Sequence, residues 1–162
     1  MTIRPAGPDD RQAILALWHQ GWHQAHAHLV PAAVLRYRTA AYFALWFDQC
    51  TDLFQVADID GAVHAFVSVK GCEIVKFYVA EKARGEGLAG PLLSHAEALL
   101  SAQGVDQAVL FCLAGNLRAE RFYARQGWEI ADTIDDELWV PDGVGETFTA
   151  RTHRLVKSLG KG

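Results

Sequence analysis

The stretch that decides the fold is Glu73–Leu100, which reads EIVKFYVAEKARGEGLAGPLLSHAEALL. Its first seven residues, EIVKFYV, are mainly apolar, β-branched or aromatic, and they predict a largely buried strand. The turn RGEGLA follows at residues 84–89, and leucines at helical spacing then predict a helix with one face in the core. We expect this helix to begin near Gly87, because Pro91 is tolerated in a first helical turn. The rest of the chain is organised around this strand, turn and helix.

The turn between this strand and helix is suited to binding an anion. Gly85 and Gly87 permit positive φ angles or the close approach of a ligand to the backbone. The first N–H groups of a helix lack acceptors within it, and the helix dipole adds partial positive charge. We therefore expect the N–H groups of residues 85–89 to bind phosphate beside the Arg84 guanidinium. The glycines also match the dinucleotide pattern G-x-G-x-x-G, but residues 80–83 intervene, and a dinucleotide turn follows its strand at once.

Length and composition favour an ordinary globular protein. The chain has 162 residues, of which 51% are hydrophobic and 21% charged, so we expect a single domain over 1–162. The formal net charge of −4 argues against a nucleic-acid partner or a membrane surface. No apolar run approaches the ~20 residues of a membrane span, and the N-terminus lacks a signal-peptide core. Three widely spaced cysteines, Cys50, Cys72 and Cys112, predict reduced thiols in a cytoplasmic protein.

The N-terminal part of the chain predicts two helices and three strands. We expect them in this order: a strand at 2–4, a helix capped by Asp9 or Asp10, a helix from Pro31 through Trp46, and strands at 54–58 and 62–70. Asp60-Gly61 between the last two strands is a strong hairpin signal. Three antiparallel strands, the last being 73–79, therefore lead to the glycine turn.

Four of the seven histidines lie close together, at positions 19, 23, 26 and 28. One interpretation is a helix end with polar, partly exposed imidazoles. Another is a zinc site, since His19 and His23 are an i, i+4 pair, although no cysteine, H-E-x-x-H motif or nearby carboxylate ligand accompanies them. We expect no metal here.

The C-terminal part continues the alternation of strands and helices. Residues 107–113 (QAVLFCL) form a continuous apolar run, which predicts a buried strand parallel to 73–79. Asn116 is expected to cap a helix that Gly127 ends. A strand at 128–134, an acidic loop at 135–146, a last strand at 147–156 and a frayed tail follow.

Two segments resemble the GCN5-related N-acetyltransferase (GNAT) family. Arg84–Ala89 is similar to its turn [Q/R]-x-x-G-x-[G/A], and NLRAERFYARQGW at 116–128 is similar to its segment N-x-x-A-x-x-[FL]-Y-x-x-x-G-[FW]. Both occur in the family's order, on the expected strand and helix contexts. The resemblance implies an α/β (α+β) fold with a mixed, mostly antiparallel sheet of about seven strands. It also implies that the sheet is splayed between two parallel strands and flanked by helices on both faces.

The resemblance implies an enzyme that moves the acetyl group of acetyl-CoA to a primary amine of a small molecule or peptide, by direct attack in a ternary complex. The pantetheine arm would pair with the strand, as a peptide does in strand addition, and the pyrophosphate would lie on the turn. The implied cofactor-binding residues are Phe77, Tyr78, Val79, Arg84, Gly85, Glu86, Gly87, Leu88, Ala89, Asn116 and Tyr123. A non-catalytic acyl-CoA-binding module of the same fold is the alternative, and a homodimer is compatible with the family.

The resemblance also implies catalytic roles. Tyr123 would protonate the leaving thiolate, and the Val79 N–H would stabilise the oxyanion. Glu73, six residues before Val79, is a candidate base, and strand alternation predicts it on the same face as Val79. His26 and His64 are the other candidates, because histidine titrates near neutrality. The residues expected to face the acceptor are Trp22, His23 and His26, and the acidic residues over 132–146 either attract a cationic amine or are simply solvated.

Overall fold

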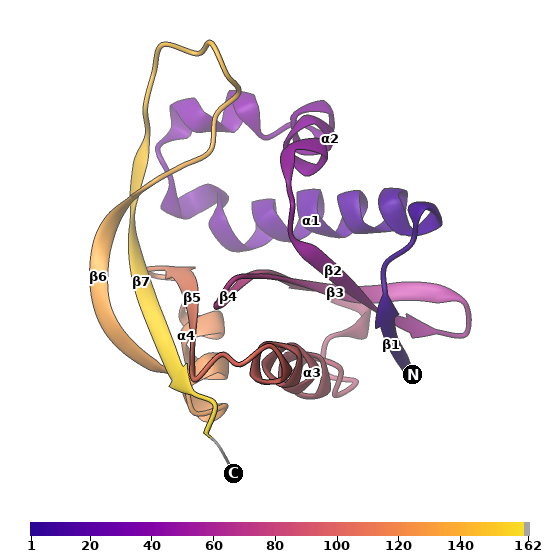
Figure 1. Cartoon of the computed structure of the whole chain (residues 1–162). Helices are drawn as coiled ribbons and strands as arrows, with labels where there is room; N and C mark the ends of the chain where they lie inside the picture. Colours follow the sequence, from indigo (N-terminus) through magenta and orange to yellow (C-terminus); the bar gives the residue numbers. More distant parts are fainter. Residues whose placement is uncertain (161–162) are drawn as a thin grey trace.

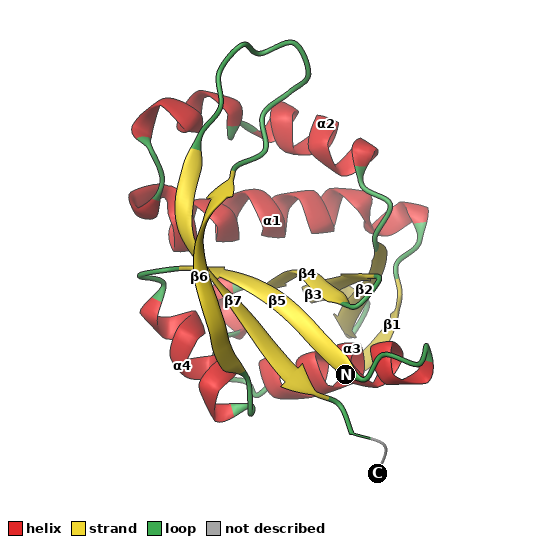
Figure 2. Ribbon diagram, turned by 60° about the vertical axis from the view of Figure 1, so that its left-hand side comes forward, coloured by secondary structure: helices red, strands yellow, loops and turns green. Residues whose placement is uncertain are grey.

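The computed structural model describes residues 1–160 and contains a seven-stranded sheet between two layers of helices (Figure 1; Figure 2). In spatial order the strands are β1 (Thr2–Pro5), β2 (Leu53–Ile59), β3 (Ala62–Lys70), β4 (Glu73–Val79), β5 (Gln107–Leu113), β7 (Thr149–Ser158) and β6 (Glu129–Glu137). The α-helices are α1 (Arg11–His26), α2 (Ala40–Gln49), α3 (Ala89–Ala102) and α4 (Leu117–Arg125). Short 3-10 helices are η1 (Pro8–Asp10), η2 (Ala27–Leu29), η3 (Ala32–Tyr37) and η4 (Glu81–Ala83). Of the neighbouring strands, β4 and β5 are parallel and the others antiparallel, which confirms the predicted sheet.

Apolar side chains fill both sides of this sheet. On one face lie α3 and α4, with a core that includes Leu92, Leu93, Ala96, Leu100 and Leu110. On the other face lie α1 and α2, where the core is largely aromatic and includes Trp18, Trp22, Phe43 and Phe66. The leucines that predicted the buried face of α3 are thus in the core, and the helices flank the sheet on both faces as expected (Figure 2).

Strands β4 and β5 separate after a short contact. Their parallel pairing joins Glu73 to Val109 and Ile74 to Leu110. Beyond these pairs, β4 stays hydrogen-bonded to β3, and β5 stays hydrogen-bonded to β7. The C-terminal ends of the two parallel strands therefore enclose a gap, which is the predicted splay of the sheet.

A β-bulge in β4 changes which of its side chains share a face. The register with β3 shifts at Val75, which is the extra residue of the bulge. Ile74 packs in the core on the α3 side, so the adjacent Glu73 lies on the α1 side. Lys76 lies on the α1 side as well, because its ammonium contacts the Trp18 ring. The expectation that Glu73 shares a face with the last residues of β4 is therefore wrong.

The single helix expected from Pro31 through Trp46 is two helices, η3 and α2. Arg38 between them has φ −123° and ψ 36°, which is not helical. Thr39 then caps α2, and its hydroxyl accepts the Tyr42 N–H (3.3 Å). The apolar pattern runs through the break because η3 and α2 both turn apolar residues to the same core.

The predicted cap of α1 also differs in detail. Asp10 is the N-cap residue, but its side chain makes no capping bond to α1. Its carboxylate instead accepts the Gly7 N–H (2.7 Å) and two bonds from the Arg4 guanidinium (2.8 and 3.0 Å). A buried carboxylate is better satisfied by a cation than by one helix N–H group.

Several boundaries were predicted imprecisely. Helix α3 begins at Ala89, two residues after Gly87. Strand β6 continues to Glu137, into the expected acidic loop, because it pairs with β7 over that length. Strand β7 runs from Thr149 to Ser158, so it starts later than expected and takes in the start of the tail. The last two residues of that tail lie outside the described part of the chain.

Within residues 1–160 no helix is both long and apolar enough to cross a membrane. The same part of the chain contains no group of three His, Cys, Asp or Glu side chains that could hold a metal ion. The His19 and His23 rings instead contact each other edge to face, with centroids 5.1 Å apart.

Candidate active site

A cavity of about 820 Å³ lies where β4 and β5 part. It is bounded by the C-terminal end of α1, the turn before α3 and the start of α4. Its lining includes Phe77, Tyr78, Val79, Arg84, Gly85, Gly87, Leu88, Ala89, Asn116, Arg118 and Tyr123. Sites for small molecules and cofactors span roughly 300–1,000 Å³, so this cavity is large enough for a cofactor-sized molecule.

Main-chain groups of β4 point into the gap. The Ala80 N–H donates to the His64 carbonyl on β3 (2.8 Å). Alternate residues of an antiparallel strand direct their N–H and C=O groups to opposite neighbours. Tyr78 therefore also directs its main chain to β3, whereas Phe77 and Val79 direct theirs toward β5, with which they are not paired. These groups can pair with the amides of a ligand, as an edge strand does.

Two glycines shape the turn before α3. Gly85 and Gly87 have φ angles of +89° and +78°, a conformation that costs little only for glycine. A Cβ at either position would meet no atom within 4 Å. The need for glycine here is therefore conformational and not a matter of packing within the protein.

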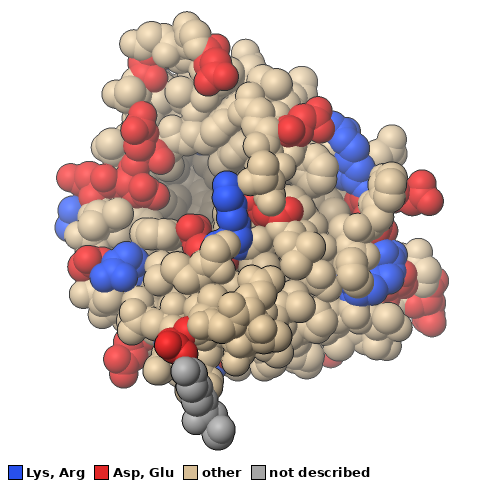
Figure 3. All heavy atoms as spheres, viewed as in Figure 1, with Lys and Arg blue, Asp and Glu red and all other residues tan. Residues whose placement is uncertain are grey.

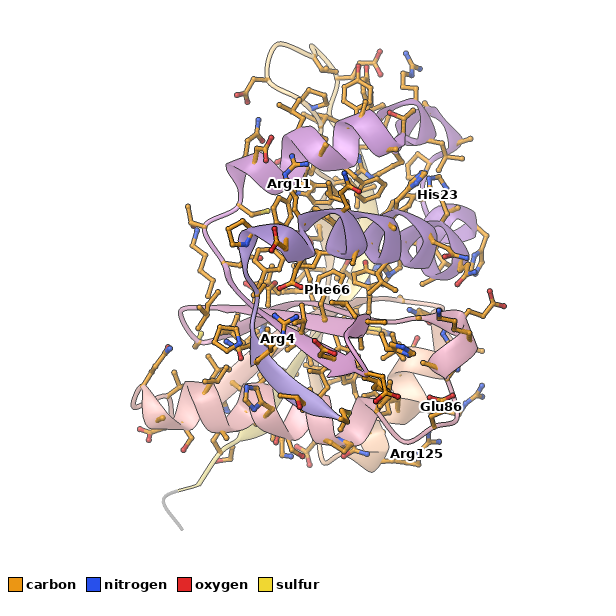
Figure 4. All side chains as sticks on the ribbon, turned by 90° about the vertical axis from the view of Figure 1, so that its right-hand side faces the viewer. Arg4, Arg11, His23, Phe66, Glu86 and Arg125 are labelled. Atoms are coloured by element: carbon orange, nitrogen blue, oxygen red, sulfur yellow. The ribbon has the colours of Figure 1, made fainter. Side chains whose placement is uncertain are left out.

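The N-terminus of α3 offers N–H groups to the same cavity. The Leu92 N–H donates to the Leu88 carbonyl (3.1 Å), so the N–H groups of residues 88–90 precede the first bond of the helix. One expectation for this turn is wrong: the Glu86 N–H donates to the Ala83 carbonyl (3.2 Å) and is not free. Figure 4 labels Glu86, whose side chain is exposed, on this turn.

Two arginines add positive charge beside the turn. The Arg84 guanidinium donates to the Gln24 side-chain oxygen on α1 (3.0 Å), and the Gln24 amide donates to Glu81 (3.0 Å). Burial, followed by the positive charge of Arg118, lowers the pKa of Arg84. Arg118 stands in the first turn of α4, where the helix dipole disfavours a cation. An anion between the two guanidinium groups relieves both effects.

Tyr123 projects from α4 into the cavity. Its side chain is 9% exposed, and its ring packs edge-on against Phe77 and Phe122, with centroids 6.3 and 5.3 Å away. Burial, and then the nearby Cys112 and Tyr78, raise the pKa of Tyr123 above its ordinary value. The phenol therefore keeps its proton at neutral pH and can donate it.

Ionisable groups also gather on the α1 side of the sheet. Lys76 and Asp52 form a buried ion pair, and the Ser68 hydroxyl donates to the same carboxylate (2.8 Å). Burial, and then the negative charge of Asp52, raise the pKa of Glu73. Figure 3 shows a hollow on this side, in front of the C-terminal end of α1, with acidic side chains over β6 on its left rim.

The sequence profile of the acetyltransferase (GNAT) family matches residues 13–128, which include β4, the glycine turn, α3, β5 and α4. The chain belongs to the acetyltransferase (GNAT) family. The family predicted from the two motifs is thereby confirmed. Membership of the GNAT family supports acetyl transfer from acetyl-CoA.

Relatives of known name agree with this GNAT assignment. A mycothiol acetyltransferase from Corynebacterium aurimucosum is 31% identical over 103 residues, which is 55% of this chain and 34% of that protein. The match thus spans about a third of the length of this curated relative. A GCN5-related N-acetyltransferase from Rhodopseudomonas palustris has the same fold, with TM-score 0.74 and 21% identity over 97% of this chain and 94% of that chain. YncA from Salmonella typhimurium was solved with acetyl-CoA. Its TM-score is 0.68 and its identity 20%, over 100% of this chain and 95% of that chain.

The GNAT fold brings most of the sequence-predicted site residues to one cavity. The predicted cofactor-binding residues line it except Glu86, and so does His26. Glu73 does not line this cavity, because the bulge turns it to the α1 side. Neither do Trp22 and His23: Trp22 is 5% exposed in the aromatic core, and a His23 ring nitrogen lies 2.7 Å from the Arg38 carbonyl. Figure 4 shows His23 between α1 and α2.

Sequence reasoning missed two residues of this GNAT site. Arg118 was overlooked. The helix dipole disfavours an arginine in a first helical turn, so its presence there is itself a signal of an anion-binding role. Phe111 of β5 also lines the cavity and is 40% exposed, unusually high for a phenylalanine. The apolar run QAVLFCL predicted a buried strand, but its burial alternates: Leu110 and Cys112 pack in the core on the α3 side, and Phe111 lies on the opposite face.

Proposed function

We propose that this protein is an acetyl-CoA-dependent N-acetyltransferase that acts on a primary amine of a small molecule or peptide. The observation that carries this proposal is the unpaired β4 edge, which opens into a cavity shared with the glycine turn and Tyr123. Family membership and the acetyl-CoA in the YncA structure support the choice of cosubstrate.

The proposed cosubstrate fits the donors that the chain presents. The Phe77 and Val79 main chains would hold the pantetheine amides in the gap. The N–H groups at Gly85, Gly87 and residues 88–90, together with the guanidinium of Arg84, would hold the pyrophosphate. Arg118 would contribute a further charge-assisted contact to a phosphate oxygen.

Three groups of this chain would carry the transfer. The Val79 N–H would donate to the thioester oxygen as it gains negative charge. The amine nitrogen would form its bond to the acetyl carbon as the carbon–sulfur bond breaks. Tyr123 would give its proton to the departing sulfur, and a general base would take the proton that the amine loses.

We assign the general base to Glu73. Because of the bulge its carboxylate lies on the α1 side of the sheet, and in this proposal the acceptor approaches from that side. Its raised pKa brings the carboxylate nearer to the range in which a base works at neutral pH. His26 is a weaker candidate, because burial, and then the charges of His28 and Arg38, lower its pKa to about 4.

Two measurements test this function. Calorimetry with acetyl-CoA and with desulfo-CoA is expected to show binding, and a thiol-release assay over a panel of amines is expected to show turnover. If folded protein gave no heat of binding with acetyl-CoA and none with desulfo-CoA, the assignment would be overturned. Heat without thiol release from any amine would instead identify a non-catalytic acyl-CoA-binding module.

A further inference from the structure

Arg38 is a buried cation without an acidic partner. It joins η3 to α2, and its side chain is 2% exposed. In residues 1–160 it forms no ion pair, and its Nη1 donates a hydrogen bond to the Tyr37 carbonyl (3.1 Å). Its Nε is buried without a hydrogen-bond partner among the described residues. Arginine is rarely buried without a partner, because removing the charge from water is costly.

The neighbouring buried cation shows the usual solution. Lys76, on the same side of the sheet, is 8% exposed and is paired with the Asp52 carboxylate. Within residues 1–160 the protein thus supplies an anion for Lys76 and none for Arg38. A ligand anion is one group that could satisfy the Arg38 guanidinium.

Three tryptophans surround the Arg38 guanidinium instead. Its central carbon lies 4.9, 5.0 and 5.8 Å from the ring centroids of Trp22, Trp46 and Trp139. Cation–π contacts offset part of the desolvation cost, but ring faces do not satisfy the in-plane N–H groups of the guanidinium. Trp139 stacks on Trp46 with centroids 4.8 Å apart and belongs to the irregular segment between β6 and β7. The cover over Arg38 on this side is therefore a loop and not a core element.

Arg38 also lies directly behind the wall of the active-site cavity. His26 and Tyr78 line that cavity. Burial, and then the charges of His28 and Arg38, lower the pKa of His26, whereas burial raises the pKa of Tyr78 and the charge of Arg38 offsets only part of that rise. The Nδ1 atom of His26 is a second buried polar atom without a partner among the described residues. Tyr78 in turn lies close enough to Tyr123 to raise its pKa. The Trp22 ring lies between Arg38 and the cavity wall: the Arg38 central carbon is 4.9 Å from its centroid, and the His26 ring centroid is 5.7 Å from it.

We propose that Arg38 binds an anionic group of the acceptor, which is a small amine that also carries a carboxylate. This inference rests on the proposed acetyl transfer, and it names the acceptor class. The amine would face Glu73 and the cavity, and the carboxylate would reach Arg38 once the Trp139 side chain moves aside. On the acid-rich β6, Asp132 and Asp135 are exposed and paired with Arg154 and Arg151, and exposed charges act weakly in water. Besides burial and Asp52, the half-buried Asp136 contributes to raising the pKa of Glu73, so its charge would favour the amine end of the acceptor.

The test compares acceptors with and without the carboxylate. Because its removal also lowers the pKa of the α-ammonium group, the decisive quantity is the change in preference between the wild type and the variant. Each L-amino acid of a panel is assayed beside its primary amide, which keeps the amine and removes the negative charge. Wild-type kcat/KM is expected to favour the carboxylate-bearing acceptor at least tenfold, and Arg38→Met is expected to reduce this preference to near unity. Arg38→Lys, which keeps the charge, is expected to restore part of it. Arg36→Met is the matched control, because Arg36 is 56% exposed and its loss changes the net charge equally.

A purely structural role of Arg38 would change the stability and the overall activity of the variant, and not its preference between the two acceptors of a pair. If Arg38 only supports the fold, Arg38→Met would lower the melting temperature and reduce activity on both members of each pair equally, and this outcome overturns the proposal. A ratio of amino-acid to amide kcat/KM that is the same in the wild type and in Arg38→Met would overturn it as well. Calorimetric titration of the preferred amino acid into protein saturated with desulfo-CoA needs no turnover. If the amino acid does not bind in this titration while acetyl-CoA still binds, the Arg38 subsite is refuted and the proposed acetyl transfer is unaffected.

Discussion

Tyr78 packs directly against Gly21 of α1: a Cβ added at Gly21 would lie 2.5 Å from Cδ1 of the Tyr78 ring. A glycine in the middle of a helix normally costs stability, so this position serves the contact between helix and strand. Since Tyr78 lines the cavity, the same contact sets the position of the cavity wall.

The first prediction concerns this contact. Gly21→Ala should destabilise the protein by about 1–3 kcal/mol, because the new methyl group displaces the Tyr78 ring. Gly90→Ala is the control: Gly90 lies within α3 and a Cβ there meets nothing within 4 Å, so it should stabilise by roughly 0.5–1 kcal/mol. Urea denaturation of both variants measures the two signs. If both substitutions changed the free energy of unfolding equally, the Tyr78 ring would be able to move away from the new methyl group without loss of stability.

The second prediction concerns the glycine turn. Gly87→Ala should weaken acetyl-CoA binding at least tenfold, because a side chain strains the positive φ and shifts the N–H groups that face the phosphates. Gly143 is a matched control, since it also has a positive φ of +86° and open space around its Cα. Gly143→Ala should carry a similar conformational cost and leave the acetyl-CoA affinity unchanged by calorimetry. Unaltered binding in Gly87→Ala would exclude the turn as the phosphate site.

The third prediction concerns the proton donor. Tyr123→Phe should lower kcat by roughly 10²–10⁴-fold without changing the acetyl-CoA affinity, because only the phenol proton is removed. Tyr42→Phe, on α2 and outside the cavity lining, should be as active as the wild type. Thiol release under saturating acetyl-CoA measures both. An unchanged kcat in Tyr123→Phe would assign the proton to another donor.

The fourth prediction concerns the base. Wild-type kcat/KM should rise with pH through the raised pKa of Glu73, since the base must lose its proton. Glu73→Gln should lose this rise and be slower at neutral pH by on the order of 10²-fold or more. In His26→Gln the rise should persist, because a histidine with a pKa of about 4 is already neutral. A rise that survives in the Glu73 variant and vanishes in the His26 variant would transfer the role to His26.

The fifth prediction concerns stability at acidic pH. Burial lowers the pKa of His26 from 6.5 to about 4 in the folded state, so between these values the unfolded chain binds more protons. Folding stability should therefore fall as the pH drops from 6.5 toward 4. Over that window the wild type should lose on the order of 2 kcal/mol more than His26→Gln, because the variant lacks this titration. Denaturation curves of both proteins at each pH measure this difference. If the free energy of unfolding of the wild type and of His26→Gln changed equally with pH, His26 would not be a buried, neutral histidine.

Local sequence was sufficient for the order of the elements and for most of one site. The strand, glycine turn and leucine helix at 73–100 were each predicted from short-range preferences, because backbone conformation and helical periodicity depend on near neighbours. The same holds for the Asn116 cap, whose side chain accepts the Ala119 N–H (3.4 Å). These pieces, with the second motif, were also sufficient to identify the family.

Tertiary packing alone decided which side chains meet. The bulge at Val75, which turns Glu73 to the opposite face, arises from the register between two strands, and no pattern within one strand encodes such a shift. The break at Arg38 lies within an unbroken apolar pattern. The buried Arg38 guanidinium contacts tryptophans from three separate segments of the chain. Contacts between residues distant in sequence depend on how whole elements pack. Periodicity shows which face of an element is buried, but not which residues of other elements that face meets.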